Sequence, residues 1–129
     1  MAVPHFWRAL VALVALFNIA LGLGFLLDPA SAGLRFFLAP LGTQGMATLR
    51  ADFTAFFVVG GAAAALAAWR SERAPLLVPI ALLSIAILGR AVSLIADGAP
   101  ATAFPPMIVE GVMVAILLAA RRAFGSARA

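Results

Sequence analysis

Four long apolar runs constrain the fold of this chain more than any other feature. They cover roughly residues 6–27, 46–69, 75–96 and 104–120, and charged residues, proline or glycine separate each run from the next. A helix needs about 20 mostly apolar residues to cross the hydrocarbon of a bilayer. The sequence therefore predicts an all-α fold, a four-transmembrane-helix bundle built as a single domain over residues 1–129.

The composition agrees with a membrane environment. Hydrophobic residues make up 65% of the chain and charged residues 11%, which is more apolar surface than a water-soluble domain of this length can cover. A cleaved secretory signal is the alternative for the first run, because Ala30-Ser31-Ala32 resembles a cleavage site. Signal cores are about 7–15 residues long, and this run is longer, so we expect it to remain as a membrane span.

The arginines indicate how the bundle is oriented. Four spans place Arg35 alone on one side of the membrane, and place the remaining flanking arginines on the other, namely Arg8, Arg70, Arg73, Arg121, Arg122 and Arg128. By the positive-inside rule we expect both termini in the cytoplasm. Membrane lipids are then the expected partners. No nucleic acid is expected, because a nucleic-acid binder gathers its basic and aromatic residues on one face.

Residues 28–45 form the longest connection, between the first and second spans. The segment is too short to span but is rich in Leu and Phe around Arg35, which favours a short interfacial helix. Pro40 and Gly42 are expected to end this helix, with Phe36 and Phe37 directed toward the acyl chains.

Small residues recur on the second span. Gly60, Ala64 and Ala68 are spaced by four, so one helix face carries almost no side chain and allows another helix to approach closely. Internal packing is the favoured interpretation, and a homo-oligomer formed through the same face stays open.

Metal and cofactor chemistry finds little support. The chain has no cysteine, and its one histidine, His5, stands in the N-terminal tail. Neither a thiolate site nor a histidine-ligated zinc or haem site is expected, so no metal and no cofactor are predicted.

Four charged residues inside the spans form the candidate site. A rise of about 1.5 Å per residue places Arg50, Asp52, Arg90 and Glu110 at a similar depth near the outer end of their spans. An isolated charge near mid-bilayer costs about 2.5–3.5 kcal/mol, and opposite charges inside the bundle offset such a cost by pairing. We expect Arg90 to pair with Glu110 and Asp52, and Arg50 to point toward the outer interface or toward Asp97.

Three further polar residues extend the candidate site. Arg90, Ser93 and Asp97 are spaced i, i+3, i+7, so they share one helix face that could form a solvated path to the cluster. Asn18 lies about one to two turns deeper on the first span. It is expected either at the floor of a cavity or as a donor of an interhelical hydrogen bond.

Several short motifs carry a resemblance to a known group. They are Arg50-Ala51-Asp52-Phe53 with Gly60-Gly61, Gly89-Arg90 with Ser93, Asp97-Gly98 with Pro100, and Glu110. In their order and spacing the chain resembles a bacterial family of four-helix membrane proteins with a domain of unknown function, DoxX-like in layout. It departs from that pattern at Thr54-Ala55-Phe56, where a small-residue pair would be expected. The resemblance implies the fold, a location in a bacterial inner (cell) membrane and the importance of the four charged residues, but no reaction.

The residues leave several functions open. Buried ion pairs often do no more than fix helix register, but ionisable residues inside a membrane frequently mark functional sites. We favour a protein that binds a lipid-like or small amphipathic ligand at the polar cluster. The alternatives are a membrane enzyme with Glu110 or Asp52 as a proton shuttle, a structural subunit with a partner in a larger membrane complex, or a small transporter.

Overall fold

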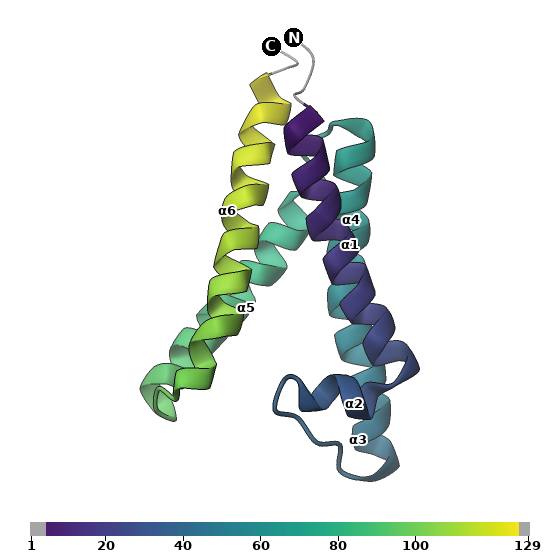
Figure 1. Cartoon of the computed structure of the whole chain (residues 1–129), viewed down its shortest axis with the longest axis vertical. Coiled ribbons are helices and arrows are strands. Elements are labelled where there is room, and N and C mark those ends of the chain that lie inside the picture. Colours follow the sequence, from purple (N-terminus) through teal and green to yellow (C-terminus); the bar gives the residue numbers. More distant parts are fainter. Residues whose placement is uncertain (1–4, 127–129) are drawn as a thin grey trace.

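The computed structural model describes residues 5–126, and these fold into helices joined by short turns (Figure 1). Along the chain the elements are α1 (His5–Leu27), α2 (Pro29–Leu34), α3 (Gly42–Thr48), the π-helical turn η1 (Leu49–Phe53), α4 (Thr54–Arg70), α5 (Leu77–Ala96), the 3-10 turn η2 (Ala101–Ala103) and α6 (Phe104–Ser126). The predicted all-α class is confirmed.

Four helical segments are long and apolar enough to cross a membrane. They are His5–Leu27, Gly42–Arg70, Leu77–Ala96 and Ala101–Gly125. Large apolar side chains face outward along them, including Leu13, Ile85 and Ile108, as expected for helices whose solvent is lipid. The chain is therefore a multi-pass membrane protein, and the second span begins at Gly42, earlier than its apolar run indicated.

The four spans are arranged as two antiparallel pairs. α1 packs along α4, and α5 packs along α6. The pairs converge at the end of the molecule where the described chain begins and ends, and they diverge at the other end (Figure 1). We call the convergent end the arginine-rich end, because it carries Arg8, Arg70, Arg73, Arg121 and Arg122. Arg128 lies outside the described residues. The divergent end, where α2, α3 and η2 lie, is called the open end.

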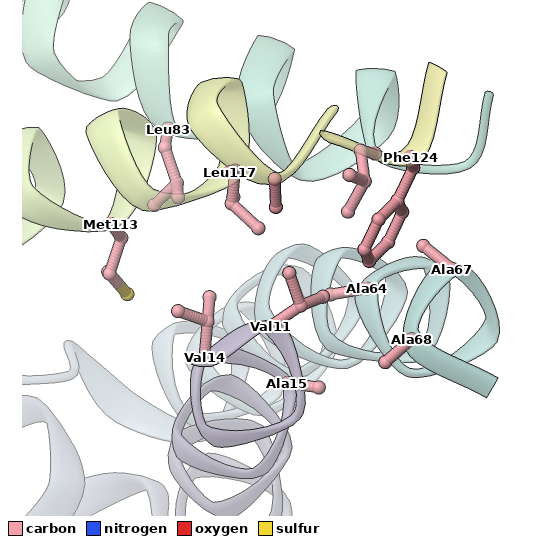
Figure 2. Close-up of a cluster of buried hydrophobic side chains, with 12 residues drawn as sticks. Val11, Val14, Ala15, Ala64, Ala67, Ala68, Leu83, Met113, Leu117 and Phe124 are labelled. Carbon is pink, nitrogen blue, oxygen red and sulfur yellow. The ribbon is translucent and has the colours of Figure 1, made fainter. Parts of the chain in front are cut away.

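Two separate apolar cores explain this divergence. The larger core joins all four spans, and Figure 2 shows Met113, Leu117 and Phe124 of α6 directed toward Val11 and other residues of the α1–α4 pair. The smaller core consists of Phe25, Leu49 and Phe57. Among the described residues it receives no side chain from α5 or α6. Continuous packing between the two pairs is therefore confined to the larger core.

The closest helix approach is between α1 and α4. A Cβ added at Gly61 would lie 2.9 Å from the backbone oxygen of Ala15 and 3.0 Å from the nitrogen of Ile19. Gly22 of α1 makes the reciprocal contact, where a Cβ would lie 2.6 Å from Cγ2 of Val58. The predicted close approach exists, but Gly61 makes it. Gly60 instead faces Pro79 and Leu82 of α5 at ordinary contact distances.

Two arginines form hydrogen bonds between α1 and the second span, one at each end of the α1–α4 pair. Arg8 of α1 donates from Nε to the carbonyl oxygen of Ala68, at 3.0 Å, near the end of α4. At the other end, Arg50 of η1 donates from Nε to the carbonyl oxygen of Leu26, at 3.1 Å. The last carbonyls of a helix lack backbone partners and carry partial negative charge. Each helix of the pair thus supplies a cationic cap to the C-terminal end of the other.

The connection after α1 contains the predicted short helix, but its details differ from the prediction. Asp28 caps α2 by accepting from the backbone nitrogen of Ser31 at 3.2 Å. Hydrogen bonds from the Ser31 hydroxyl and then its amide hold the pKa of Asp28 below its usual value. The helix ends at Leu34 rather than at Pro40 and Gly42.

The two phenylalanines after α2 have different surroundings. Phe36 does not turn toward lipid as predicted, because its ring packs against Phe25, at 5.3 Å between centroids, and against Phe57, at 5.8 Å. Phe37 has a left-handed backbone and a 76% exposed side chain. The prediction of a lipid-facing ring therefore fits Phe37 alone.

We expect Gly61→Ala to destabilise the bundle by about 1–3 kcal/mol, since the added methyl group meets backbone atoms that cannot rotate away. Gly24→Ala is the matched control, because nothing lies within 4 Å of a Cβ at that α1 position. Unfolding of both variants in mixed detergent micelles would measure the difference. Equal stabilities would show that the helices do not depend on this approach.

Candidate functional site

A cavity of about 670 Å³ lies between the two helix pairs. Its mouth includes Arg35 and Phe37 after α2, and Pro100 and Thr102 around η2. The remaining lining residues are Phe17, Leu21, Phe36, Phe57, Leu83, Arg90, Ala103, Pro105, Pro106, Val109, Glu110 and Met113. Leu83 and Met113 also belong to the larger core. The cavity therefore runs from the open end to the level where the pairs meet, and we call it the central cavity.

An ion pair between α5 and α6 stands in the wall of this cavity. Nε of Arg90 donates to both carboxylate oxygens of Glu110, at 3.2 Å to Oε1 and 3.1 Å to Oε2. The Glu110 side chain is 13% exposed and that of Arg90 is 35% exposed. The predicted pairing of these two residues is confirmed. Bonds to charged groups are among the stronger hydrogen bonds in proteins, so this contact joins the two helices.

Arg90 keeps unused hydrogen-bonding capacity. A guanidinium group has five N–H donors, and only its Nε bonds to a described residue. The four Nη donors therefore have no partner within residues 5–126. Arg90 lines the central cavity and two smaller neighbouring spaces. These donors are thus placed where a bound polar group could accept from them.

The first neighbouring space, the aromatic chamber, has a volume of about 310 Å³. It is lined by Phe36, Asp52, Phe53, Phe56, Phe57, Ala86, Arg90 and Glu110. Four of these residues also line the central cavity, namely Phe36, Phe57, Arg90 and Glu110. The chamber is therefore a side compartment of the central cavity, toward η1.

Asp52 shares the aromatic chamber with the ion pair but takes no part in it. The expected bond from Arg90 to Asp52 is not formed, and Asp52 has no hydrogen bond or ion pair to any described residue. Because the formal charges of Arg90 and Glu110 cancel, the carboxylate of Asp52 gives the lining of the chamber an excess of negative formal charge.

Arg50 is not part of the cluster. Of the two predicted directions, the contact with Asp97 is not formed, and Nε of Arg50 donates to the carbonyl oxygen of Leu26 where α1 ends, at the open end. Asp52 lies two residues away but faces the chamber. Both residues belong to the π turn, a rare helical geometry that is frequent at functional sites.

Ser93 and Asp97 lie beside the ion pair on its outer side. They line a second space of about 470 Å³ that also includes Arg90, Gly98 and Pro100. Both side chains are exposed. The predicted shared face of Arg90, Ser93 and Asp97 is therefore present, as a surface groove along α5.

Asn18 is buried beneath the site rather than exposed in it. Its side chain is 4% exposed, and Nδ2 donates to the Val14 carbonyl at 2.9 Å and to the sulfur of Met113 at 3.5 Å. Of the two expectations for Asn18, the interhelical hydrogen bond is confirmed and the cavity floor is wrong. Met113, which also lines the cavity, covers it on the side of α6.

Arg35 is a site residue that the sequence reasoning missed. Arg35 lines the central cavity, is exposed, and its side chain makes no hydrogen bond or ion pair with residues 5–126. The available signal is that Arg35 is the only arginine in the two outer connections. Arginine placement alone indicates topology, so this signal does not identify a site residue.

Comparisons with protein families, with curated proteins and with solved structures find no match to this chain. The resemblance to DoxX-like proteins stays a prediction, and the site is interpreted from geometry alone. The described residues contain no group of three or more His, Asp or Glu side chains able to hold a metal ion. What the site offers is a charged pair, unpaired ionic groups and an apolar cavity.

We expect Glu110→Gln to destabilise the protein by about 1–3 kcal/mol, because it leaves the Arg90 charge without its counter-ion in an apolar setting. The double variant Arg90→Gln with Glu110→Gln removes both charges and should regain most of this loss. Unfolding of the single and double variants in mixed micelles would test the coupling. Strictly additive losses would show that the pair does not hold α5 to α6.

Proposed function

We propose that this chain binds a lipid-like, small amphipathic molecule in its central cavity, with the polar end of that molecule at Arg90. The observation that carries the proposal is a charged side chain with unused donors in the wall of a largely apolar cavity. Ligand sites typically combine such an apolar lining with a few convergent polar groups. A volume of about 670 Å³ lies within the usual range for such sites.

The lining suits a molecule with two different ends. Leu83 and Met113 of the larger core, together with Phe17 and Leu21 of α1, offer contacts for an acyl chain. Toward the open end stand the ion pair and Arg35. A charge-assisted hydrogen bond to an Arg90 Nη group would fix the polar end, and burial of the chain would supply most of the affinity.

The proposal includes an orientation in the membrane. We place the arginine-rich end in the cytoplasm of a bacterial cell, by the positive-inside rule. The open end then lies in the outer leaflet, so the polar end of the ligand lies near the outer headgroups. A lipid could enter between the diverging pairs without its headgroup crossing the bilayer.

Filling the cavity provides the direct test. We expect Val109→Trp to reduce binding of a single-chain phospholipid at least about tenfold, because the indole occupies the space that the acyl chain needs. Val112→Trp is the matched control, since Val112 is 54% exposed on the same helix and does not line the cavity. Binding would be measured by displacing a lysophospholipid labelled on its chain from purified protein in maltoside micelles. Equal affinities of the two variants would contradict the proposal.

A further inference from the structure

The aromatic chamber differs chemically from the rest of the site. Its polar lining consists of the neutralised Arg90–Glu110 pair and the unpaired Asp52, and phenylalanine rings form most of its apolar lining. Aromatic ring faces attract cations, and sites for quaternary ammonium groups are commonly built from several rings. A net negative charge among phenylalanines is suited to an organic cation and unsuited to an anion.

The rings of the chamber are held in place by packing. Phe53 stacks on the buried Phe25 with 4.7 Å between centroids, and Phe56 meets Phe57 edge to face at 5.1 Å. Phe36 closes the cluster from the segment after α2. A ligand would therefore meet an arrangement of rings that exists before binding, which lowers the entropic cost of recognition.

The opposite charge preference holds just outside the chamber. Arg90 and Arg35 both line the central cavity, and the Nη groups of Arg90 and the side chain of Arg35 have no partners among residues 5–126. Arginine is well suited to recognise phosphate oxygens. Because the chamber and the cavity share Arg90 and Glu110 in their walls, a phosphate site and an ammonium site would be neighbours.

We infer that the site selects a zwitterionic headgroup, in which a phosphodiester lies against Arg90 and Arg35 and an ammonium group occupies the aromatic chamber beside Asp52. This inference rests on the proposed function and adds the ligand class to it. The ligand is an amphiphile of the phosphocholine or phosphoethanolamine type. An anionic phospholipid with the same chain would leave Asp52 unpaired and close to its negative charge.

The test compares two lipids that differ in the ammonium group. Lysophosphatidylcholine and lysophosphatidylglycerol with the same acyl chain both carry one phosphodiester, and only the first carries an ammonium. We expect the full-length protein to bind lysophosphatidylcholine about tenfold more tightly in the displacement assay. Glycerophosphocholine, which has no acyl chain, should compete only weakly, which separates a lipid ligand from a free headgroup.

Three variants test whether the aromatic chamber causes the preference for lysophosphatidylcholine. Asp52→Asn should abolish the difference between the two lipids by weakening lysophosphatidylcholine binding, with lysophosphatidylglycerol binding unchanged or tighter. Phe56→Leu keeps an apolar side chain but removes a ring, and should reduce the preference in part. Asp97→Asn is the matched control, because it removes an exposed carboxylate of the neighbouring groove and should leave the preference intact.

The outcomes separate this inference from the function on which it rests. Equal binding of the two lipids, or a preference that persists in Asp52→Asn, would overturn the ammonium site but leave amphiphile binding intact. Failure of both lipids to bind the unaltered protein would overturn both. Since Asp52 is exposed and makes no bond with residues 5–126, its substitution should not alter thermal unfolding, which would be recorded for each variant.

Discussion

The close approach of α1 and α4 is the constraint on which the rest of the structure depends. Gly61 lets the backbones meet, Gly22 receives Val58 in return, and Arg8 and Arg50 cap the two ends of the pair. Because apolar side chains gain nothing from leaving lipid for another apolar surface, helices in membranes associate through such close packing and through hydrogen bonds. These contacts hold α1 and α4 together, and the pair in turn holds the adjacent aromatic cluster in place.

The α5–α6 pair packs against the α1–α4 pair over only part of its length. The larger core fastens α5 and α6 near the arginine-rich end, while the smaller core belongs to the first pair alone. The Arg90–Glu110 bond, which joins α5 to α6, lies beyond the larger core toward the open end, because Arg90 follows Leu83 on α5 and Glu110 precedes Met113 on α6. The Nη donors of Arg90 have no partner among residues 5–126, and its side chain is 35% exposed. The pair therefore joins α5 to α6 without using all the hydrogen-bonding capacity of Arg90.

The sequence predicted those features that depend on the depth of a residue in the membrane and on the sign of its charge. The apolar runs located the four spans, and the common depth of Arg90 and Glu110 predicted their pairing. The sequence also placed Asp52 beside Arg90 and Arg50 away from it, but it could not show that Asp52 stays unpaired in the chamber or that Arg50 caps α1. The π turn that contains both leaves no trace in apolar periodicity. Nor could the spacing of small residues show that Gly61, rather than Gly60, meets α1.

The separation of packing from recognition also accounts for the position of the ionic groups. Charges within the larger core would have required desolvation without access to a ligand, at a cost of several kcal/mol for each ion. At the open end they can remain solvated until a ligand with complementary charges replaces the water. A ligand that contacts both pairs binds only the folded arrangement and therefore stabilises it by mass action. A ligand in the central cavity would thus bridge the two pairs where they share the least protein packing.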